Sequence, residues 1–403
     1  MKCLPSCLLV ALLCGACLEP IRGTSELECT PGVAATGCQS FEQRGQARKV
    51  TVGTQHACAL LETGGVRCWG GNGLVGDGTR ASRATAVDVR GLGSGVLAVS
   101  AGDLHTCAVL EGGTVRCWGD NSRGQLGTGD TLPALEPVEV PGLGSNVLVV
   151  TTGQAHSCAL HAGGQVTCWG ANDRLQLGGG TGTHSTRAVA VNGLPANLTA
   201  LSAGATHTCA STAAGEAWCW GSNTSGELGV GQAGMDRASG PMRVTGLMGP
   251  ARALTAGGGH TCARVGDGEV ACWGSNVTGA LGDDTALDSL TPVRPVGLSS
   301  GIRQVRAGWA FTCAVAPDGG VHCWGQNQSG QLGDGTRLHR AAPVRVKGLE
   351  NGAEDVAAGM TSACAVLRDG RVVCWGGNAQ GQLGDGSQTD RVSPVVVDGL
   401  GVP

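Results

Sequence analysis

The sequence predicts an all-β fold, a seven-bladed β-propeller whose blades are four-stranded antiparallel sheets with one disulfide each. Fourteen cysteines form seven pairs whose members lie ten residues apart, and successive pairs begin 49, 51, 51, 53, 51 and 51 residues apart. A regular period of about 50 residues is typical of a solenoid or a propeller. The 403 residues include 72 glycines, no tyrosine and only 14% charged residues. This composition favours short strands and tight turns over a disordered or collagen-like chain.

Each unit supplies four short strands, as the second unit illustrates. Residues 105–109 and 115–119 are two strand segments joined by a glycine turn at Gly112-Gly113. A polar loop separates them from a third segment at 137–140, and the β-branched run 147–150 begins the next unit. Alternation and turn spacing of this kind predict antiparallel sheet. Four strands repeated seven times indicate seven radial blades.

The unit boundaries follow from the period. The seven units are expected at about 47–95, 96–146, 147–197, 198–250, 251–301, 302–352 and 353–403, after an N-terminal segment at 17–46. How the ring closes is open at this stage. Either each unit is one blade, or the final strand around 394–397 completes the sheet begun by residues 49–69. The second arrangement ties the two ends of the ring by hydrogen bonds as well as packing, and it is the one we expect.

The first residues predict export. Lys2, an apolar run from Leu8 to Leu13 and the small residues before Cys17 have the layout of a signal peptide at 1–16. Cys17 stands where the lipobox of bacterial lipoproteins has its acylated cysteine, so a lipid anchor on Cys17 is expected, with plain secretion as the alternative. Leu18 favours the outer membrane if the cell is Gram-negative. Either route leads to an oxidising compartment of the bacterial cell envelope or to secretion, where disulfides persist.

A family resemblance becomes specific at residues 323–336, which read C-W-G-x-N-x-x-G-Q-L-G-D-G-T. This run, nearly repeated at 374–387, resembles the repeat of the regulator of chromosome condensation family, and the resemblance covers about residues 47 to 400. It implies a seven-bladed β-propeller. The eukaryotic founder exchanges nucleotide on the GTPase Ran and docks on chromatin. An exported chain meets neither, so that activity is not expected here, whereas a secreted member that inhibits beta-lactamases is a precedent for protein capture.

The cysteine pairs are interpreted as disulfides, with zinc as the weaker alternative. Both members of each pair flank one hairpin, which brings their Cα atoms within reach of a bridge. Closing such a loop stabilises the fold by about 2.5–3 kcal/mol in the chain-entropy model. Units six and seven keep both cysteines but have Phe311 and Ser362 where a zinc site would need histidine. The expected disulfides are Cys29–Cys38, Cys58–Cys68, Cys107–Cys117, Cys158–Cys168, Cys209–Cys219, Cys262–Cys272, Cys313–Cys323 and Cys364–Cys374.

Three other residue types recur once per unit. Five histidines at one repeat position (His56, His105, His156, His207 and His260) predict a blade-to-blade hydrogen bond rather than catalysis. The seven tryptophans that precede a glycine (Trp69, Trp118, Trp169, Trp220, Trp273, Trp324 and Trp375) are expected between neighbouring blades, with stacking on sugars as the alternative. The G-D-G-T turns at Asp77, Asp334 and Asp385 have too few carboxylates for calcium and are expected to be Asx-type turns.

For function, the residues favour a non-catalytic scaffold that binds a protein. No zinc-protease or phosphate-loop motif occurs, and a net charge of −4 without a basic block argues against nucleic acid. No cofactor or metal is expected, and the chain is expected to be a monomer. The alternative is a hydrolase or lyase that acts on polysaccharide in the central channel. Candidate partner-binding residues lie in the loop before each outer strand: Arg80, Arg83, Leu132, Leu135, His184, Arg187, Met235, Arg237, Leu287, Leu290, Arg337, His339, Arg340 and Arg391.

Overall fold

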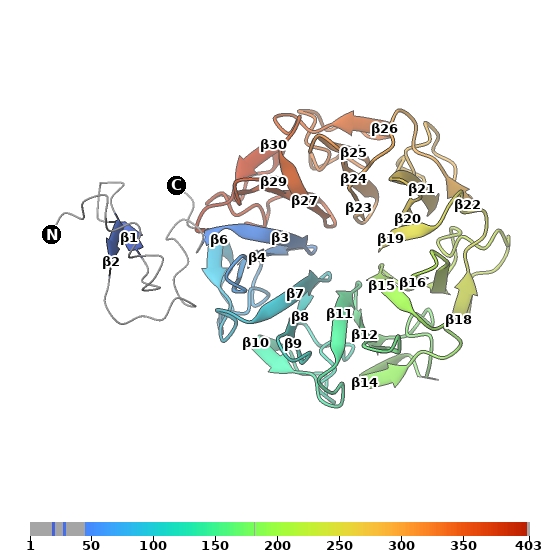
Figure 1. Cartoon of the computed structure of the whole chain (residues 1–403), viewed down its shortest axis with the longest axis horizontal. Coiled ribbons are helices and arrows are strands. Elements are labelled where there is room, and N and C mark those ends of the chain that lie inside the picture. Colours follow the sequence, from blue (N-terminus) through green and yellow to red (C-terminus); the bar gives the residue numbers. More distant parts are fainter. Residues whose placement is uncertain (1–17, 21–26, 30–44, 181, 401–403) are drawn as a thin grey trace.

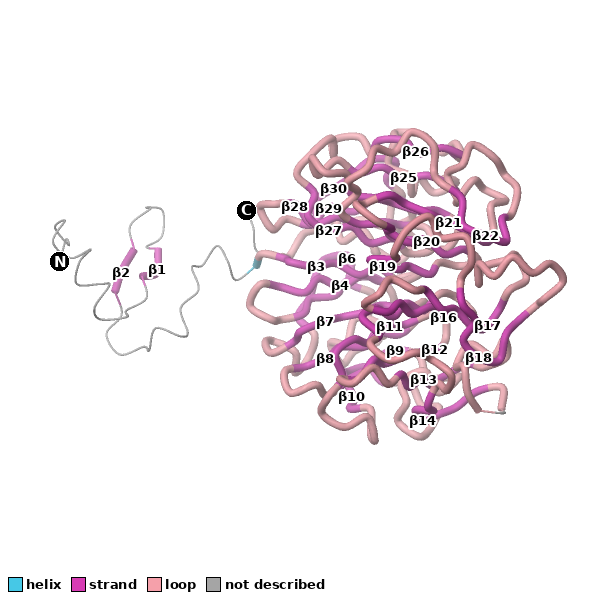
Figure 2. The backbone as a smooth tube through the Cα atoms, turned by 45° about the vertical axis from the view of Figure 1, so that its right-hand side comes forward, coloured by secondary structure: helices cyan, strands magenta, loops and turns pink. Residues whose placement is uncertain are grey.

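Seven four-stranded antiparallel sheets stand around a central axis in the computed structural model (Figure 1). The structure describes residues 18–20, 27–29, 45–180 and 182–400. Within each sheet the strands follow chain order from the axis outward. The loops between the third and fourth strands are 12–14 residues long, and loops cover much of the surface of the ring (Figure 2). The predicted all-β propeller, with one disulfide in each blade, is therefore confirmed.

The strands of the first four blades have the following bounds. Blade 1 contains β3 (Ala47–Val52), β4 (His56–Leu61), β5 (Val66–Gly70) and β6 (Arg83–Asp88). Blade 2 contains β7 (Val96–Ala101), β8 (His105–Leu110), β9 (Val115–Gly119) and β10 (Ala134–Glu139). Blade 3 contains β11 (Val147–Thr152), β12 (His156–His161), β13 (Val166–Ala171) and β14 (His184–Ala190). Blade 4 contains β15 (Leu198–Ala203), β16 (His207–Thr212), β17 (Ala217–Ser222) and β18 (Arg237–Arg243).

The remaining strands complete the ring. Blade 5 contains β19 (Ala251–Ala256), β20 (His260–Val265), β21 (Glu269–Gly274) and β22 (Ser289–Val293). Blade 6 contains β23 (Gln304–Ala307), β24 (Phe311–Val315), β25 (Val321–Gly325) and β26 (Arg340–Arg345). Blade 7 contains β27 (Ala353–Ala358), β28 (Ser362–Leu367), β29 (Val372–Gly376) and β30 (Arg391–Val396).

The N-terminal segment contributes one described hairpin. Strand β1 (Leu18–Pro20) pairs antiparallel with β2 (Leu27–Cys29). The predicted signal peptide, the predicted lipid site Cys17 and the predicted partner of Cys29, Cys38, lie outside the described residues. No helix in the described ranges is long and apolar enough to cross a membrane.

The hydrophobic core lies between consecutive blades rather than at the centre of the ring. One cluster, for example, joins Cys158 and Leu160 of blade 3 to Leu201, Ala210 and Trp220 of blade 4. Each cluster buries the second and third strands of one blade against the inner strands of the next. Because the facing strands of neighbouring blades carry small residues and disulfides, the sheets approach closely and bury little side-chain area per blade.

Each disulfide joins directly opposed residues of the two middle strands. Cys158 on β12 lies opposite Cys168 on β13, for example, and the same register recurs in every blade. The Cα atoms of the seven pairs are 4.0–4.1 Å apart, which matches the closely spaced type of antiparallel residue pair. The bridges are buried and leave no thiolate for zinc in these seven units.

We predict that none of the fourteen propeller cysteines reacts with a thiol reagent unless the protein is first reduced. Replacing one pair by serine, as in C158S/C168S, is expected to lower the free energy of unfolding by about 2.5–3 kcal/mol. Mass spectrometry after alkylation, with and without reduction, measures the first quantity, and urea unfolding measures the second. Labelled cysteines in unreduced protein would contradict the assignment.

The expected ring closure is wrong. Strand β30 pairs with β29 of its own blade, and β6 remains the outer strand of blade 1. Each unit is therefore one blade. Blade 7 meets blade 1 through the same backbone bond as at the preceding junction: the Gly386 amide donates to the Ala84 carbonyl at 2.9 Å, just as Gly335 donates to Val392. The connection from β29 to β30 (residues 377–390) has the same length, 14 residues, as the connection from β25 to β26 (residues 326–339). The last unit therefore pairs its outer strand locally, as the preceding unit does, and no strand is exchanged between the ends.

At the 7–1 junction, two further backbone bonds tie the ends of the chain together. Ala47 donates to the carbonyl of Gly370 at 3.0 Å, and Ala86 donates to that of Asp398 at 2.9 Å. We therefore predict that deleting residues 391–403 increases hydrogen exchange in β29 and at Ala86, whereas amides of β5 stay protected because β4 and β6 still flank that strand. Loss of protection throughout β5, with β29 unaffected, would be the opposite result.

Candidate functional site: blade junctions, rim loops and central channel

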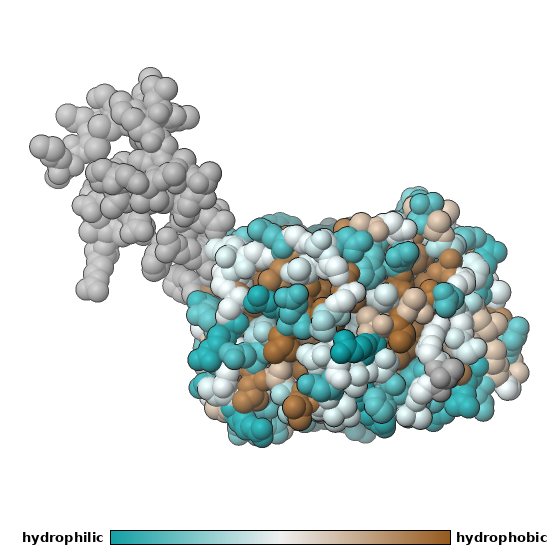
Figure 3. All heavy atoms as spheres, turned by 90° about the horizontal axis from the view of Figure 1, so that it is seen from below, coloured by the Kyte–Doolittle hydropathy of each residue, from teal (hydrophilic) through white to brown (hydrophobic). Residues whose placement is uncertain are grey.

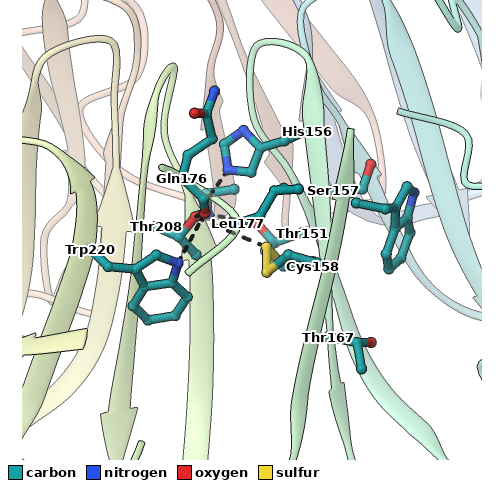
Figure 4. The surroundings of a disulfide bond; sticks show 12 residues. Thr151, His156, Ser157, Cys158, Thr167, Gln176, Leu177, Thr208 and Trp220 are labelled. Atoms are coloured by element: carbon teal, nitrogen blue, oxygen red, sulfur yellow. Dashed lines mark hydrogen bonds between the residues drawn. A yellow bond between two sulfur atoms is a disulfide. The ribbon is translucent and has the colours of Figure 1, made fainter. Parts of the chain in front are cut away.

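The repeat histidines bond across blade junctions, as predicted. The His156 imidazole Nε2 lies 3.0 Å from the Thr208 hydroxyl of the next blade (Figure 4). That hydroxyl donates to the Gln176 carbonyl at 3.0 Å, and the Trp220 indole donates to the same carbonyl at 2.9 Å. Because the hydroxyl hydrogen is used on Gln176, Thr208 accepts from His156, which fixes the imidazole as the neutral Nε2–H tautomer. The corresponding pairs are His56–Thr106, His105–Ser157, His207–Thr261 and His260–Thr312.

Burial keeps these histidines neutral. It lowers the pKa of His56 to about 4 and those of His105, His156 and His260 to about 3. Burial also lowers the pKa of His207, although the negative charge of Glu227 acts to raise it. A group sealed between blades and unable to take a proton near pH 7 cannot act as a general acid there, so the histidines are structural.

The two junctions without this histidine lack its partner as well. At the junction of blades 6 and 7, Phe311 replaces the histidine and Ala363 replaces the hydroxyl residue, and both lie in one apolar cluster. At the junction of blades 7 and 1, Ser362 replaces the histidine and Ala57 replaces the hydroxyl residue. The histidine and the hydroxyl are thus either both present or both replaced. This pairing across about 50 residues is visible in the sequence, but it is recognisable only once the blades are known to be neighbours.

The acid sensitivity of the fold is expected to come largely from these junctions. An unfolded histidine has a pKa near 6.5 and takes up a proton that the folded chain excludes, so stability falls as the pH drops below about 6.5, by about 2 kcal/mol per buried histidine at pH 5. We predict that H156F/T208A, which copies the natural Phe311–Ala363 pair, reduces this loss by that amount. Urea unfolding at pH 7 and pH 5 measures it.

The single variant T208A serves as the comparison for this prediction. It leaves the buried Nε2–H of His156 without an acceptor, so we expect a loss of about 1–3 kcal/mol already at pH 7. If the double variant loses as much stability between pH 7 and pH 5 as the wild type, the junction histidines are not the source of the acid sensitivity.

The seven repeat tryptophans also lie between blades, as predicted. Each is fully buried and donates its indole N–H to a backbone carbonyl of the preceding blade, at 2.8–3.1 Å. They are therefore sealed from ligands and cannot stack on sugars. The polysaccharide alternative therefore loses these seven side chains as a stacking platform.

The G-D-G-T segments are Asx-type turns, as expected. The carboxylate of Asp77 accepts from the backbone amide of Thr79 at 2.9 Å and from its hydroxyl at 2.8 Å, and Asp334 and Asp385 repeat this arrangement. Among the residues that the structure describes, no three histidine, cysteine or acidic side chains gather in a metal-binding cluster.

Several candidate partner-binding residues are engaged within the ring. Arg83, Arg340 and Arg391 form ion pairs with the turn aspartates, at 2.6, 3.0 and 2.8 Å. Leu135 and Leu290 are half-buried against the preceding blade, Met235 packs on a core cluster, and Arg187 lies over the turn at Gly129. Arg337 pairs with Asp390 at 3.3 Å, and Arg237 reaches the Asp173 carbonyl at 3.4 Å. The side chains of Arg80, His184 and His339 are exposed.

The rim loops between the third and outer strands expose large apolar side chains. Leu132, Leu287 and Leu338 occupy the same loop position in blades 2, 5 and 6 and are 70, 75 and 62% exposed. Val277, earlier in the blade 5 loop, is 75% exposed. These loops lie on the same side of the ring as the turns between the first and second strands, because consecutive strands of a blade run in opposite directions. One contact joins the two: the Thr278 hydroxyl in the blade 5 loop donates to the Ala310 carbonyl in the first turn of blade 6.

The central channel has a volume of about 350 Å³ and is lined by the inner strands and the turns that follow them. Its main charged group is Asp355, which is buried and well satisfied. The carboxylate accepts from the Gln304 side chain at 2.6 Å and from the Val50 amide at 2.9 Å, while Lys49 and Arg306 lie 3.6 and 3.9 Å away. Sequence reasoning missed this cluster because it departs from the repeat at single positions of three blades.

Side chains in the channel also join the inner edges of neighbouring blades. At five junctions a hydroxyl accepts an amide of the next inner strand: Thr51 from Ala101, Ser100 from Thr152, Thr151 from Ala203, Ser202 from Ala256 and Thr255 from Ala307. In blades 6 and 7 this position holds Arg306 and Ala357. At these two junctions the acceptor stands two residues earlier on the inner strand: Gln304 accepts from the Val356 amide, and Asp355 accepts from the Val50 amide.

The comparisons with known proteins agree with this architecture. Two family models, both described as regulator of chromosome condensation (RCC1) repeat, match the chain. One matches residues 47–74, 96–125, 148–176, 198–227, 251–280, 302–331 and 353–382, and the other matches 112–160, 214–264, 267–315, 318–366 and 369–402.

Relatives and solved structures are similar over most of the propeller. The ultraviolet-B receptor UVR8 of Arabidopsis thaliana is 32% identical over 364 residues, which cover 88% of this chain and 82% of the relative. The human E3 ubiquitin-protein ligase HERC2 is 32% identical over 279 residues, but the match spans only 6% of its length. Structures of human WBSCR16 and of Prp20p from Saccharomyces cerevisiae both give a TM-score of 0.71 at 22% identity. They cover 79% and 88% of this chain, and 85% and 90% of their own chains.

Proposed function

Because this chain belongs to the family of proteins built from regulator of chromosome condensation (RCC1) repeats, we propose that it is a non-catalytic scaffold that binds a partner protein through the rim loops of its blades. The Prp20p structure was described together with binding to Gsp1p and histones, and yeast RCC1 was solved bound to Kap60. These relatives support protein binding as the general role. The partner of this chain is a separate matter and depends on its own loops.

The observation that carries the proposal is the repeated exposed leucine of the rim loops. Leu132, Leu287 and Leu338 stand at one loop position on one rim, and their side chains are largely exposed and available for contact with another molecule. On the side of the ring in Figure 3, hydrophobic atoms are instead interspersed with polar ones, which is ordinary for a protein surface. Leucines brought repeatedly to one rim by the fold favour that rim as the docking surface.

We also propose that the chain acts outside the cytoplasm, anchored through a lipid on Cys17. Seven buried disulfides support an oxidising compartment, because reducing compartments rarely preserve such bridges. The leader sequence supports export, and the cysteine directly after its small residues supports acylation.

A non-enzymatic role is favoured by how the repeat uses its reactive residue types. The histidines are neutral and sealed, the cysteines are bridged, and the turn aspartates are held by turn amides and arginines. Within the described part of the channel, Asp355 is held by Gln304, Val50 and two cationic side chains. No group among these is poised for nucleophilic or acid–base chemistry.

The rim proposal predicts that L132S/L287S/L338S weakens partner binding at least about tenfold, because each leucine loses apolar contact area at the interface. The partner is first isolated by affinity capture from envelope fractions of producing cells. Its dissociation constant is then measured for wild type and variant by calorimetry. The exposed positions make a folding defect unexpected, and the melting temperature checks this.

The matched control is L97S/L148S. These two leucines are also exposed, at 53 and 60%, but they lie near the start of inner strands β7 and β11, at the opposite rim. The control should bind as the wild type does. Equal weakening by both variants, or by the control alone, would assign binding to a different surface.

A further inference from the structure

The channel end on the rim of the exposed leucines has an unusual set of side chains. The residue after the glycine in each turn from first to second strand lies at this level. Six of these seven residues line the mouth, namely Asp103, Gln154, Ala205, Gly258, Trp309 and Met360, and the seventh is Thr54. Only one of the seven carries a charge and only one is aromatic. Backbone amides at several of these positions hold neighbouring blades together, as where Thr54 donates to the Asp103 carbonyl at 3.2 Å, so these contacts between blades do not depend on the side chains.

Asp103 is a carboxylate without a cation. Among residues 45–180 and 182–400, no lysine, arginine or histidine nitrogen lies within 4.0 Å of it, in contrast to Asp355. Burial raises the pKa of Asp103 to about 6, while the neighbouring Thr54 and Gln154 side chains act in the opposite direction. A carboxylate in a partly desolvated mouth gains much from an incoming positive charge.

Trp309 lies across the mouth from Asp103. The two residues belong to blades 6 and 2, which are nearly opposite in a ring of seven. The Trp309 ring extends toward blade 5, where a Cβ added at Gly258 would come within 3.0 Å of the indole and closer still to the Trp309 carbonyl. Gly258 thus makes room for the ring beside the channel. Unlike the seven repeat tryptophans, Trp309 is only half-buried and lines the cavity.

We propose that this mouth binds an organic cation, an alkylammonium or alkylguanidinium group, between the Asp103 carboxylate and the Trp309 indole. The carboxylate supplies the opposite charge, and an indole face attracts cations by its quadrupole. Met360 beside Trp309 and Ala205 on the far side are suited to the alkyl stem. The channel volume of about 350 Å³ is in the range of small-ligand sites.

The channel's own cations do not occupy this site. Lys49 and Arg306 both lie against Asp355, on the inner strands below the mouth. The other titratable groups around Asp103 are His56, His105 and His156, which stay neutral behind the turns. The inference does not require the rim loops to bind a protein, because the cation can belong to a free amine or to a lysine or arginine side chain.

Calorimetric titration with n-butylammonium, n-butylguanidinium and the neutral isostere n-butylurea tests the site. We expect saturable binding of both cations at pH 7, at least tenfold weaker binding of n-butylurea, and at least tenfold weaker binding of the cations by D103N. Because the carboxylate must be ionised, affinity for the cations should be about tenfold lower at pH 5 than at pH 7. At pH 6, in buffers of different ionisation heat, about half a proton should be released per cation bound.

Three variants complete the design. D284N removes the same charge from an exposed loop residue on the same rim, at a positive φ that asparagine tolerates, and should bind as the wild type does. W309L should weaken the binding of the two cations more than the binding of n-butylurea. D103E keeps the charge and should retain part of the affinity, which separates loss of the carboxylate from misfolding.

The outcomes are distinct from those of the rim experiment. No saturable cation binding by the wild type, equal affinity of D103N, or an affinity independent of pH overturns the proposal, whatever the leucine variants do. Binding of Nα-acetyl-lysine amide as tight as that of n-butylammonium assigns the site to protein side chains. Binding of the free alkyl cations alone assigns it to free amines.

Discussion

The propeller depends on one backbone carbonyl per blade, just before the leucine of the G-Q-L segment or its equivalent. At the junction in Figure 4 this is Gln176, which accepts from both Trp220 and Thr208 of the next blade. The tryptophan fills the wedge between sheets, and its hydrogen bond fixes how deeply it enters. The indole bond recurs at all seven junctions, including the one between blades 7 and 1. The ring therefore closes with a tryptophan between each pair of blades and without exchange of strands.

The disulfides follow from that geometry. Sheets that approach this closely leave room for only small side chains on the two middle strands, and a buried alanine or cysteine meets the limit. Little hydrophobic area is then available per blade, and a bridge replaces part of the missing stabilisation by restricting the unfolded chain. Each blade thus has its own cross-link and the same indole bond to its neighbour. The loops are consequently free to differ from blade to blade.

The repeat arithmetic was enough to predict the blades, the bridges and the roles of the histidines and tryptophans, because each is a local or periodic feature. Ring closure was mispredicted because the repeat phase fits equally well whether β30 pairs with β29 or with the first blade; the structure shows the local pairing. Arg83, Arg340 and Arg391 were expected to meet a partner, yet an aspartate six residues earlier holds each one. Asp103, Trp309 and Asp355 were missed because each occurs at its repeat position in one blade only, and a search for periodic features does not find a residue that occurs once.

Those departures nevertheless occur where the fold can accept them. At the mouth, amides and carbonyls make the contacts between blades: Trp309 donates to Gly359 and Ala205 to Gly257 through the backbone alone. The side chain at this turn position makes none of these bonds and differs from blade to blade, although Gly258 must stay small beside Trp309. In the channel the opposite holds, because Asp355 and Gln304 take over a bond that hydroxyls make elsewhere. Asp355 has two cationic side chains of the chain beside it, whereas Asp103 has only the polar side chains of Thr54 and Gln154. This difference is why the mouth and not the channel wall is the place to look for a ligand.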